Sequence, residues 1–155
     1  CVEKDLQNVF KRILGEFGYH EENKTLIIAE AVEPKEQTIR EDILAKIRFC
    51  KFIVADITGK GIGKGERFNP NCVYELGYAH ALNKKIIATV CREMSHDKKH
   101  KKPIYVPFDF SGVKFSYWNR NPTEESQKQF EDELKSRIKD IHMDFQREYW
   151  PPSNP

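Results

Sequence analysis

Residues 51–87, KFIVADITGKGIGKGERFNPNCVYELGYAHALNKKII, contain an apolar run, a glycine-rich segment and an amphipathic segment in direct succession. The apolar run at 52–55 has no polar interruption, which is typical of a strand covered on both faces in a parallel sheet. Asn69, Pro70 and Asn71 form a helix-start signal, since either asparagine can cap the helix and proline suits its first turn. The stretch therefore predicts one strand–loop–helix unit of an open α/β sheet.

Apolar residues recur at helical or strand spacing on both sides of this unit. Before the unit we expect a helix over residues 5–17, a strand over 26–29 and a helix over 39–50. The last of these starts at a capping box of Thr38 and Glu41. After the unit we expect a strand over 86–90, a short strand within 103–110 and a helix from about 123 to 150. This order predicts an α/β fold of the flavodoxin-like class, three-layer α/β/α with a parallel sheet. Because the chain opens on a helix, we expect a first strand of that sheet to precede Cys1.

Two other segments are predicted to lack regular structure. Residues 92–102 are polar and basic without an apolar period, so their lysines are interpreted as part of a solvated loop. Residues 111–121 contain Tyr117 and Trp118 in a turn-like context. These two aromatic side chains either pack in the core or stack on a base of a bound ligand.

The composition is that of a globular chain with its own core. It has 155 residues, 39% of them hydrophobic, a mean hydropathy of −0.70 and no apolar run long enough to cross a bilayer. We expect a single domain over residues 1–150, a tail over 151–155 and a cytoplasmic location away from membranes. The net charge of +2 argues against a nucleic-acid partner. The four cysteines lack metal-ligand spacing, so they are interpreted as reduced thiols and no metal site is expected.

A candidate site lies where the strand at 52–55 ends and the next helix begins. Ligands of open α/β sheets bind beyond the carboxyl ends of the strands, where helix amino termini also point. The residues expected to converge there are Asp56, Thr58, Gly59, Asn69, Asn71, Tyr74 and Glu75. Glu75 is expected in or near the first turn of the helix, where donor N–H groups favour an ionised carboxylate. Such a carboxylate suits a nucleophile or the stabiliser of a ribosyl cation.

Structural roles remain open for the same residues. Glu75 can satisfy free N–H groups at the helix start, and Asp56 can be a turn former at the strand end. The glycine-rich segment from Gly59 to Gly65 lacks the P-loop spacing, so it is either a solvated loop or a lid over a bound nucleotide. His80 follows Glu75 by five residues and is interpreted as a packed helix histidine rather than a catalytic base.

Two motifs, ADITG at 55–59 and NPNCVYELGYAHAL at 69–82, resemble the TIR-like, nucleoside 2-deoxyribosyltransferase-like superfamily. The resemblance extends from the first helix to about Tyr117. It implies a flavodoxin-like fold, nucleoside or nucleotide ligands, and cleavage of the bond between ribose C1′ and a base nitrogen. The catalytic glutamate of the family corresponds to Glu75. By the same motif match the pocket is lined by Asp56, Asn69, Asn71 and Tyr74.

Two departures from the family pattern shape the expected function. Deoxyribosyltransferases carry an aspartate where this chain has Asn69, and an amide cannot protonate a neutral leaving base. NAD needs no such acid because its nicotinamide is already cationic, so the resemblance favours an NAD glycohydrolase that takes NAD as substrate and requires no cofactor. The second departure is the longer loop over residues 60–68, which covers or reshapes the pocket.

Three alternatives to this activity remain open. One is an enzyme that transfers deoxyribose between nucleosides. Another is a TIR-like module in signalling or defence that binds a nucleotide, or a further TIR surface, without catalysis. The third is a chain whose activity depends on self-association, as TIR assemblies imply.

Overall fold

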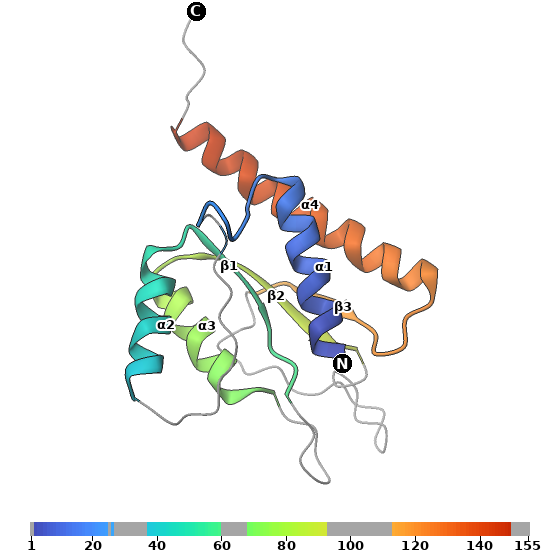
Figure 1. Ribbon diagram of the computed structural model, residues 1–155, viewed down its shortest axis with the longest axis horizontal. Coiled ribbons are helices and arrows are strands. Elements are labelled where there is room, and N and C mark those ends of the chain that lie inside the picture. The colour runs from blue at the N-terminus through green and yellow to red at the C-terminus, as the bar shows by residue number, and fades with distance from the viewer. Residues whose placement is uncertain (1, 25, 27–36, 60–67, 93–112, 150–155) are drawn as a thin grey trace, which may run out of the picture. The chain divides into compact units, whose positions relative to one another are not determined.

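The computed structural model describes residues 2–24, 26, 37–59, 68–92 and 113–149 (Figure 1). Its elements in chain order are α1 (Val2–Glu16), α2 (Gln37–Phe49), β1 (Phe52–Asp56), α3 (Pro70–Ala81), β2 (Lys85–Cys91), β3 (Phe115–Trp118) and α4 (Glu124–Tyr149). The chain divides into two compact units, Cys1–Ile28 with Lys128–Pro155, and Ala29–Gln127. The second unit contains the sheet and the candidate site. The expectation of a single domain over residues 1–150 stays a prediction.

Three parallel strands form the described sheet in the order β1-β2-β3. Asp56 at the end of β1 is the register partner of Thr89 in β2. Cys91 at the end of β2 is the register partner of Trp118, which ends β3. The predicted α/β class with a parallel sheet is thereby confirmed, and the carboxyl ends of the three strands meet at one edge (Figure 1).

β3 lies within residues 111–121, which the sequence predicts to be turn-like, and that prediction is wrong. Ser116 and Trp118 are buried, whereas Phe115 and Tyr117 are only partly buried, which is the alternation of a strand. The strand has four residues and turn-forming residues on both sides in the sequence. Four residues are therefore too few for the alternating pattern to be recognised among the turn-forming residues around it.

The polar side chains of Asp56 and Thr89 lie on the face of the sheet opposite α3. On one face an apolar cluster of buried residues packs with α3: Ile57, Leu76, Ala88 and Val90. Direct contacts of α3 with both β1 and β2 belong to the same layer. Because side chains alternate along a strand, Asp56, Thr89 and Trp118 lie on the opposite face. The polar residues of the strand ends are thus separated from the α3 layer by the sheet itself.

The cap at the start of α3 is the one that the sequence predicts. The Asn69 side-chain oxygen accepts hydrogen bonds from the backbone N–H groups of Asn71 and Cys72, and a proline occupies the first helical position. At the other end the Asn83 N–H donates to the His80 carbonyl at 2.9 Å, and Asn83 has a φ of 54°. This left-handed residue ends the helix where the sequence predicts.

One helix terminus differs from its prediction, and another is held by a contact across helices. Thr38 lies inside α2 rather than at its cap, because the helix already includes Gln37, so the predicted capping box is wrong. The Lys84 ammonium, shortly after α3, donates to the carbonyls of Arg48 and Cys50, at 2.8 and 2.7 Å, where α2 ends. This charge-assisted contact ties the ends of α2 and α3 together.

Several sequence predictions concern residues outside the described ranges. The predicted strand over residues 26–29 lies, except for Leu26, outside the described residues. The predicted strand within 103–110, most of the predicted loop over 92–102 and most of the glycine-rich segment lie outside them as well.

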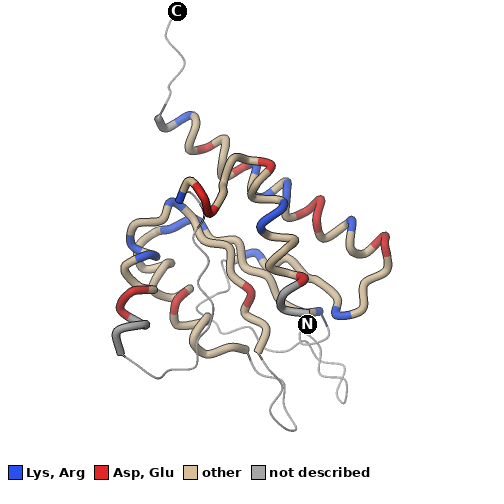
Figure 2. The backbone as a smooth tube through the Cα atoms, in the orientation of Figure 1, with Lys and Arg blue, Asp and Glu red and all other residues tan. Residues whose placement is uncertain are grey.

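The first unit contains α1 and most of α4, which form where the sequence predicts helices. Each helix buries an apolar stripe, and its members are Leu6, Ile13 and Leu14 in α1 and Phe130, Leu134 and Ile138 in α4. Two ion pairs join the helices, Arg12 with Glu131 at 2.6 Å and Lys135 with Glu16 at 2.9 Å. Figure 2 shows residues of both charges along α4. In the described parts of the chain no helix combines the length and the apolar character needed to span a membrane.

Two glycine-to-alanine substitutions should change stability in opposite directions. A Cβ on Gly77, inside α3, meets no atom within 4 Å, so Gly77→Ala should raise the free energy of unfolding by about 0.5–1 kcal/mol. Gly18 follows α1 with a φ of +82°, so Gly18→Ala should lower the free energy of unfolding by about 1 kcal/mol. Urea denaturation of both variants measures the two changes, and equal signs would contradict the assignment.

Candidate functional site

The carboxylate of Asp56 connects the ends of all three described strands. Its Oδ1 accepts a hydrogen bond from the Thr58 backbone N–H at 2.9 Å. Its Oδ2 accepts one from the Thr89 hydroxyl at 2.7 Å and one from the Trp118 indole Nε1–H at 2.6 Å. A single side chain therefore joins the end of β1 to β2 and β3 at the edge where parallel strands place their ligands.

Burial raises the pKa of Asp56 above its ordinary value, and the hydrogen bonds from Thr58, Thr89 and Trp118 oppose this effect. Thr58 acts on this pKa through its side chain as well as through its backbone N–H. Both threonine hydroxyls can accept as well as donate, so they can adapt when Asp56 is protonated, whereas the Trp118 indole can only donate.

The backbone beyond β1 stays attached to the sheet. The Ile57 N–H donates to the Thr89 carbonyl at 3.0 Å, which extends the β1–β2 pairing by one residue. Thr58 then contributes its hydroxyl oxygen, which accepts from the Cys91 N–H at 2.9 Å. Gly59 is buried. The predicted ligand-binding residues Thr58 and Gly59 are thus held in place at the sheet edge by β2.

The start of α3 is fixed to the same edge. The Asn69 N–H donates to the carbonyl of Ile57 at 3.0 Å, so the residue that caps the helix also pairs with the end of β1. The side-chain oxygen of Asn69 is used for the cap described above. Asn71, the second residue of the helix, is partly buried. The backbone contact between strand end and helix start positions this turn without help from a ligand.

Glu75 is the sixth residue of α3 and lies in its second turn, next to the first turn, in or near which it is expected. It is partly buried, and it lies four residues after Asn71, so these two side chains share one face of the helix. Tyr74 is 53% exposed. His80 is exposed, which corrects its interpretation as a packed histidine; the buried residues of α3 are Leu76 and Ala79.

The predicted site residues form two groups rather than one cluster of side chains. Asp56, Thr58 and Gly59 belong to the sheet edge, and their side-chain bonds run to β2 and β3. The second group belongs to α3 and its cap: Asn69, Asn71, Tyr74 and Glu75. The backbone bond between Asn69 and Ile57 joins the groups. Because the Asp56 carboxylate lies on the face opposite α3, its described hydrogen bonds include none to the α3 group.

Sequence reasoning misses one residue of the sheet edge and leaves the role of another open. Trp118 is either a core or a stacking residue by its sequence context, and its burial supports the core interpretation. A buried indole N–H requires an acceptor, and that requirement is the signal for a nearby carboxylate. Thr89 is the residue that is missed. The only signal for it is a threonine within an otherwise apolar strand.

No cluster of three or more metal-ligating side chains exists among the residues that the structure describes. The three cysteines in this part of the chain, Cys50, Cys72 and Cys91, are not joined in disulfides. The described residues therefore give no basis for assigning a metal ion or a disulfide.

Comparison of the chain with protein-family models, curated proteins and solved structures finds no match. The likeness to the TIR-like, nucleoside 2-deoxyribosyltransferase-like superfamily therefore rests on the two sequence motifs alone, and the functional assignment rests on those motifs and on the geometry of the strand ends.

The pH dependence of the free energy of unfolding should reveal the raised pKa of Asp56 in the folded state. Because its pKa is raised in the folded state above the usual 3.8, the folded chain holds this proton more tightly than the unfolded chain does. Its contribution to stability is therefore largest below that value and is lost as pH rises through the folded-state pKa. The free energy of unfolding of the wild type minus that of Asp56→Asn should fall as pH rises above the ordinary aspartate pKa of 3.8 and through the folded-state pKa.

Urea titrations of both proteins across this range provide the measurement. Titrations of all other groups cancel in the difference, since both chains contain them. A difference that rises with pH would mean that hydrogen bonding outweighs burial at Asp56, and a constant difference would mean that Asp56 has the same pKa in both states.

Proposed function

We propose that the protein cleaves the N-glycosidic bond of NAD or a related nucleotide, with Glu75 as the catalytic residue. The observation that supports this most is the fixed start of α3, where Asn69 both caps the helix and pairs with the end of β1. This anchoring fixes the start of the helix that carries Glu75 five residues later. A partly buried carboxylate on a helix with a fixed start can contact a bound substrate in one defined orientation, which catalysis requires.

The proposal includes the finer fold, a flavodoxin-like arrangement with helices on both faces of the parallel sheet. In such sheets ligands bind beyond the carboxyl ends of the strands. The three strand ends joined by Asp56 then form the floor of the site. The residues proposed to contact the ribose or phosphate groups are Asp56, Thr58, Gly59, Asn71 and Tyr74.

The chemistry requires one bond to break and one to form. The bond between ribose C1′ and the nicotinamide nitrogen breaks, and its electron pair neutralises the pyridinium, so nicotinamide leaves as a neutral molecule. The Glu75 carboxylate stabilises the developing cation at C1′ or attacks that carbon. Water then supplies the hydroxyl at C1′, and one proton is released. The products of hydrolysis are nicotinamide and the ribosylated remainder of the nucleotide.

The hydrogen bonds of the Asn69 side chain favour NAD over neutral nucleosides as substrate. Its side-chain oxygen accepts from two helix N–H groups, which leaves only the NH₂ group to face a ligand. An amide NH₂ can donate a hydrogen bond but cannot deliver a proton to a departing base. Deoxyribosyl transfer between neutral nucleosides is therefore the less supported activity.

The test is base release by the wild type, Glu75→Gln and a matched control, Glu125→Gln. The control removes an exposed carboxylate from the first turn of α4 and leaves the sheet edge unchanged. Incubation with NAD and a panel of nucleosides, followed by chromatography of the products, should show nicotinamide release by wild type and control. Glu75→Gln should be slower by at least about a hundredfold, because the amide cannot stabilise the cation.

The three chains must share the same circular dichroism spectrum and unfolding midpoint for the rates to be compared. Equal rates for Glu75→Gln and wild type would remove Glu75 from the chemistry. Nucleotide binding detected by calorimetry without any base release from the wild type would contradict the enzyme and support the non-catalytic binding module.

A further inference from the structure

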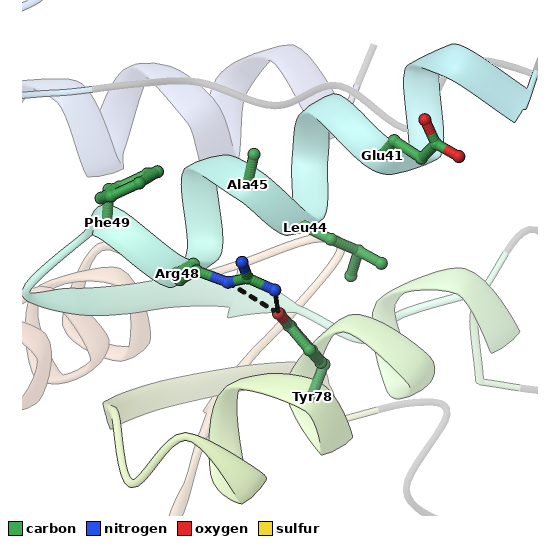
Figure 3. A pocket seen from close by; sticks show the side chains of 6 residues that line it. All are labelled: Glu41, Leu44, Ala45, Arg48, Phe49 and Tyr78. Carbon is green, nitrogen blue, oxygen red and sulfur yellow. Dashed lines mark hydrogen bonds between the residues drawn. The ribbon is translucent and has the colours of Figure 1, made fainter.

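A groove lies between α2 and α3 (Figure 3). Its volume is about 360 Å³, and it is lined by Glu41, Leu44, Ala45, Arg48, Phe49 and Tyr78. Five of these six residues belong to α2. The groove is therefore mainly a property of one face of that helix, and none of its residues belongs to the proposed active site.

The exposed face of α2 has a regular pattern. Glu41, Leu44, Ala45 and Arg48 are spaced i, i+3, i+4 and i+7, which places them in one stripe along the helix. The helix buries Ile47 on its other side. Next to the stripe, Phe49 is 85% exposed, which is unusual for a phenylalanine in a folded chain. The stripe thus has an apolar centre, one charge at each end and an exposed aromatic ring beside it.

The two charges at the ends of the stripe lack a partner of opposite sign within the described part of the chain. Arg48 donates from Nε and Nη2 to the Tyr78 hydroxyl, at 3.3 and 3.0 Å, which orients the guanidinium, and no carboxylate of the described residues forms an ion pair with it (Figure 3). Glu41 is exposed and enters no ion pair among the described residues. By contrast, Asp42 and Lys46 on the neighbouring face pair with each other.

The stripe is complementary to itself under a two-fold rotation. A two-fold axis that crosses α2 midway between Leu44 and Ala45 places two copies of the helix antiparallel. Glu41 of each copy then lies opposite Arg48 of the other, because both are about 5 Å along the helix axis from that midpoint. Leu44 meets Ala45 of the second copy at the centre. Phe49 of each copy lies over the part of the groove near Glu41 of the other.

We propose that this face of α2 docks a second copy of the same chain in an antiparallel two-fold dimer. The charge pattern favours a second copy as the partner, because each stripe has a negative charge at one end and a positive charge at the other. Rotation by 180° therefore places opposite charges next to each other at both ends. The apolar centre and Phe49 supply the buried area, and the two charge pairs set the register. The dimer does not depend on the proposed glycosidic activity, because the groove and the strand ends share no residue.

The test uses charge reversal in the full-length chain. Glu41→Arg alone and Arg48→Glu alone each bring like charges together twice in the dimer, so each variant should weaken dimerisation by at least about tenfold. An equimolar mixture of the two variants restores opposite charges in both pairs. Sedimentation velocity over a concentration series should therefore show dimers for the wild type and for the mixture, and monomers for each variant alone at the same concentration.

Two further variants complete the design. Phe49→Ala should weaken the dimer, and at a concentration where both proteins are monomeric it should leave the unfolding midpoint unchanged, because the ring is exposed in the monomer. Glu125→Arg, an exposed charge reversal on α4, should leave dimerisation unchanged. A wild type that is monomeric at every concentration would overturn the proposal. So would single variants that dimerise like the wild type, or a mixture that stays monomeric while the wild type dimerises.

Discussion

The arrangement of the sheet edge depends on one buried carboxylate and the three hydrogen bonds that it accepts. Asp56 ends β1, Thr89 belongs to β2 and Trp118 ends β3, and the donors approach both carboxylate oxygens within 2.9 Å. Parallel strands give no tight turn to hold their carboxyl ends together. The carboxylate supplies that connection. Its burial raises its pKa and its three donors lower it, and burial has the larger effect.

The fixed end of β1 in turn positions the start of α3. The carbonyl of Ile57, immediately after Asp56, accepts from Asn69 N–H, and Asn69 caps α3. The position of Glu75 along the helix is thereby set by backbone bonds that run back to β1. This separates two roles that acidic residues have at such an edge. Asp56 connects the strand ends on one face of the sheet, and Glu75, the proposed catalytic residue, belongs to the α3 layer on the other.

How much of the structure can be predicted from the sequence depends on the length of each pattern. α3 is predicted with its cap because Asn69-Pro70-Asn71 is a strong local signal. The parallel strands β1 and β2 are predicted from uninterrupted apolar runs. β3 is missed because four residues are too few to establish a period against neighbouring turn formers. The bond from Trp118 to Asp56 joins residues 62 positions apart, so no local pattern could reveal it.

The nuclear magnetic resonance signal of the Trp118 indole N–H tests the central claim most directly. The chain has two tryptophans, so comparison with Trp150→Phe assigns the resonance. If Trp118 donates to the Asp56 carboxylate, its Nε1–H signal lies downfield of an ordinary indole. That signal moves with pH around a midpoint above the usual aspartate pKa, and it loses the pH dependence in Asp56→Asn. An indole signal at the ordinary position, unaffected by pH and by Asp56→Asn, would contradict the account.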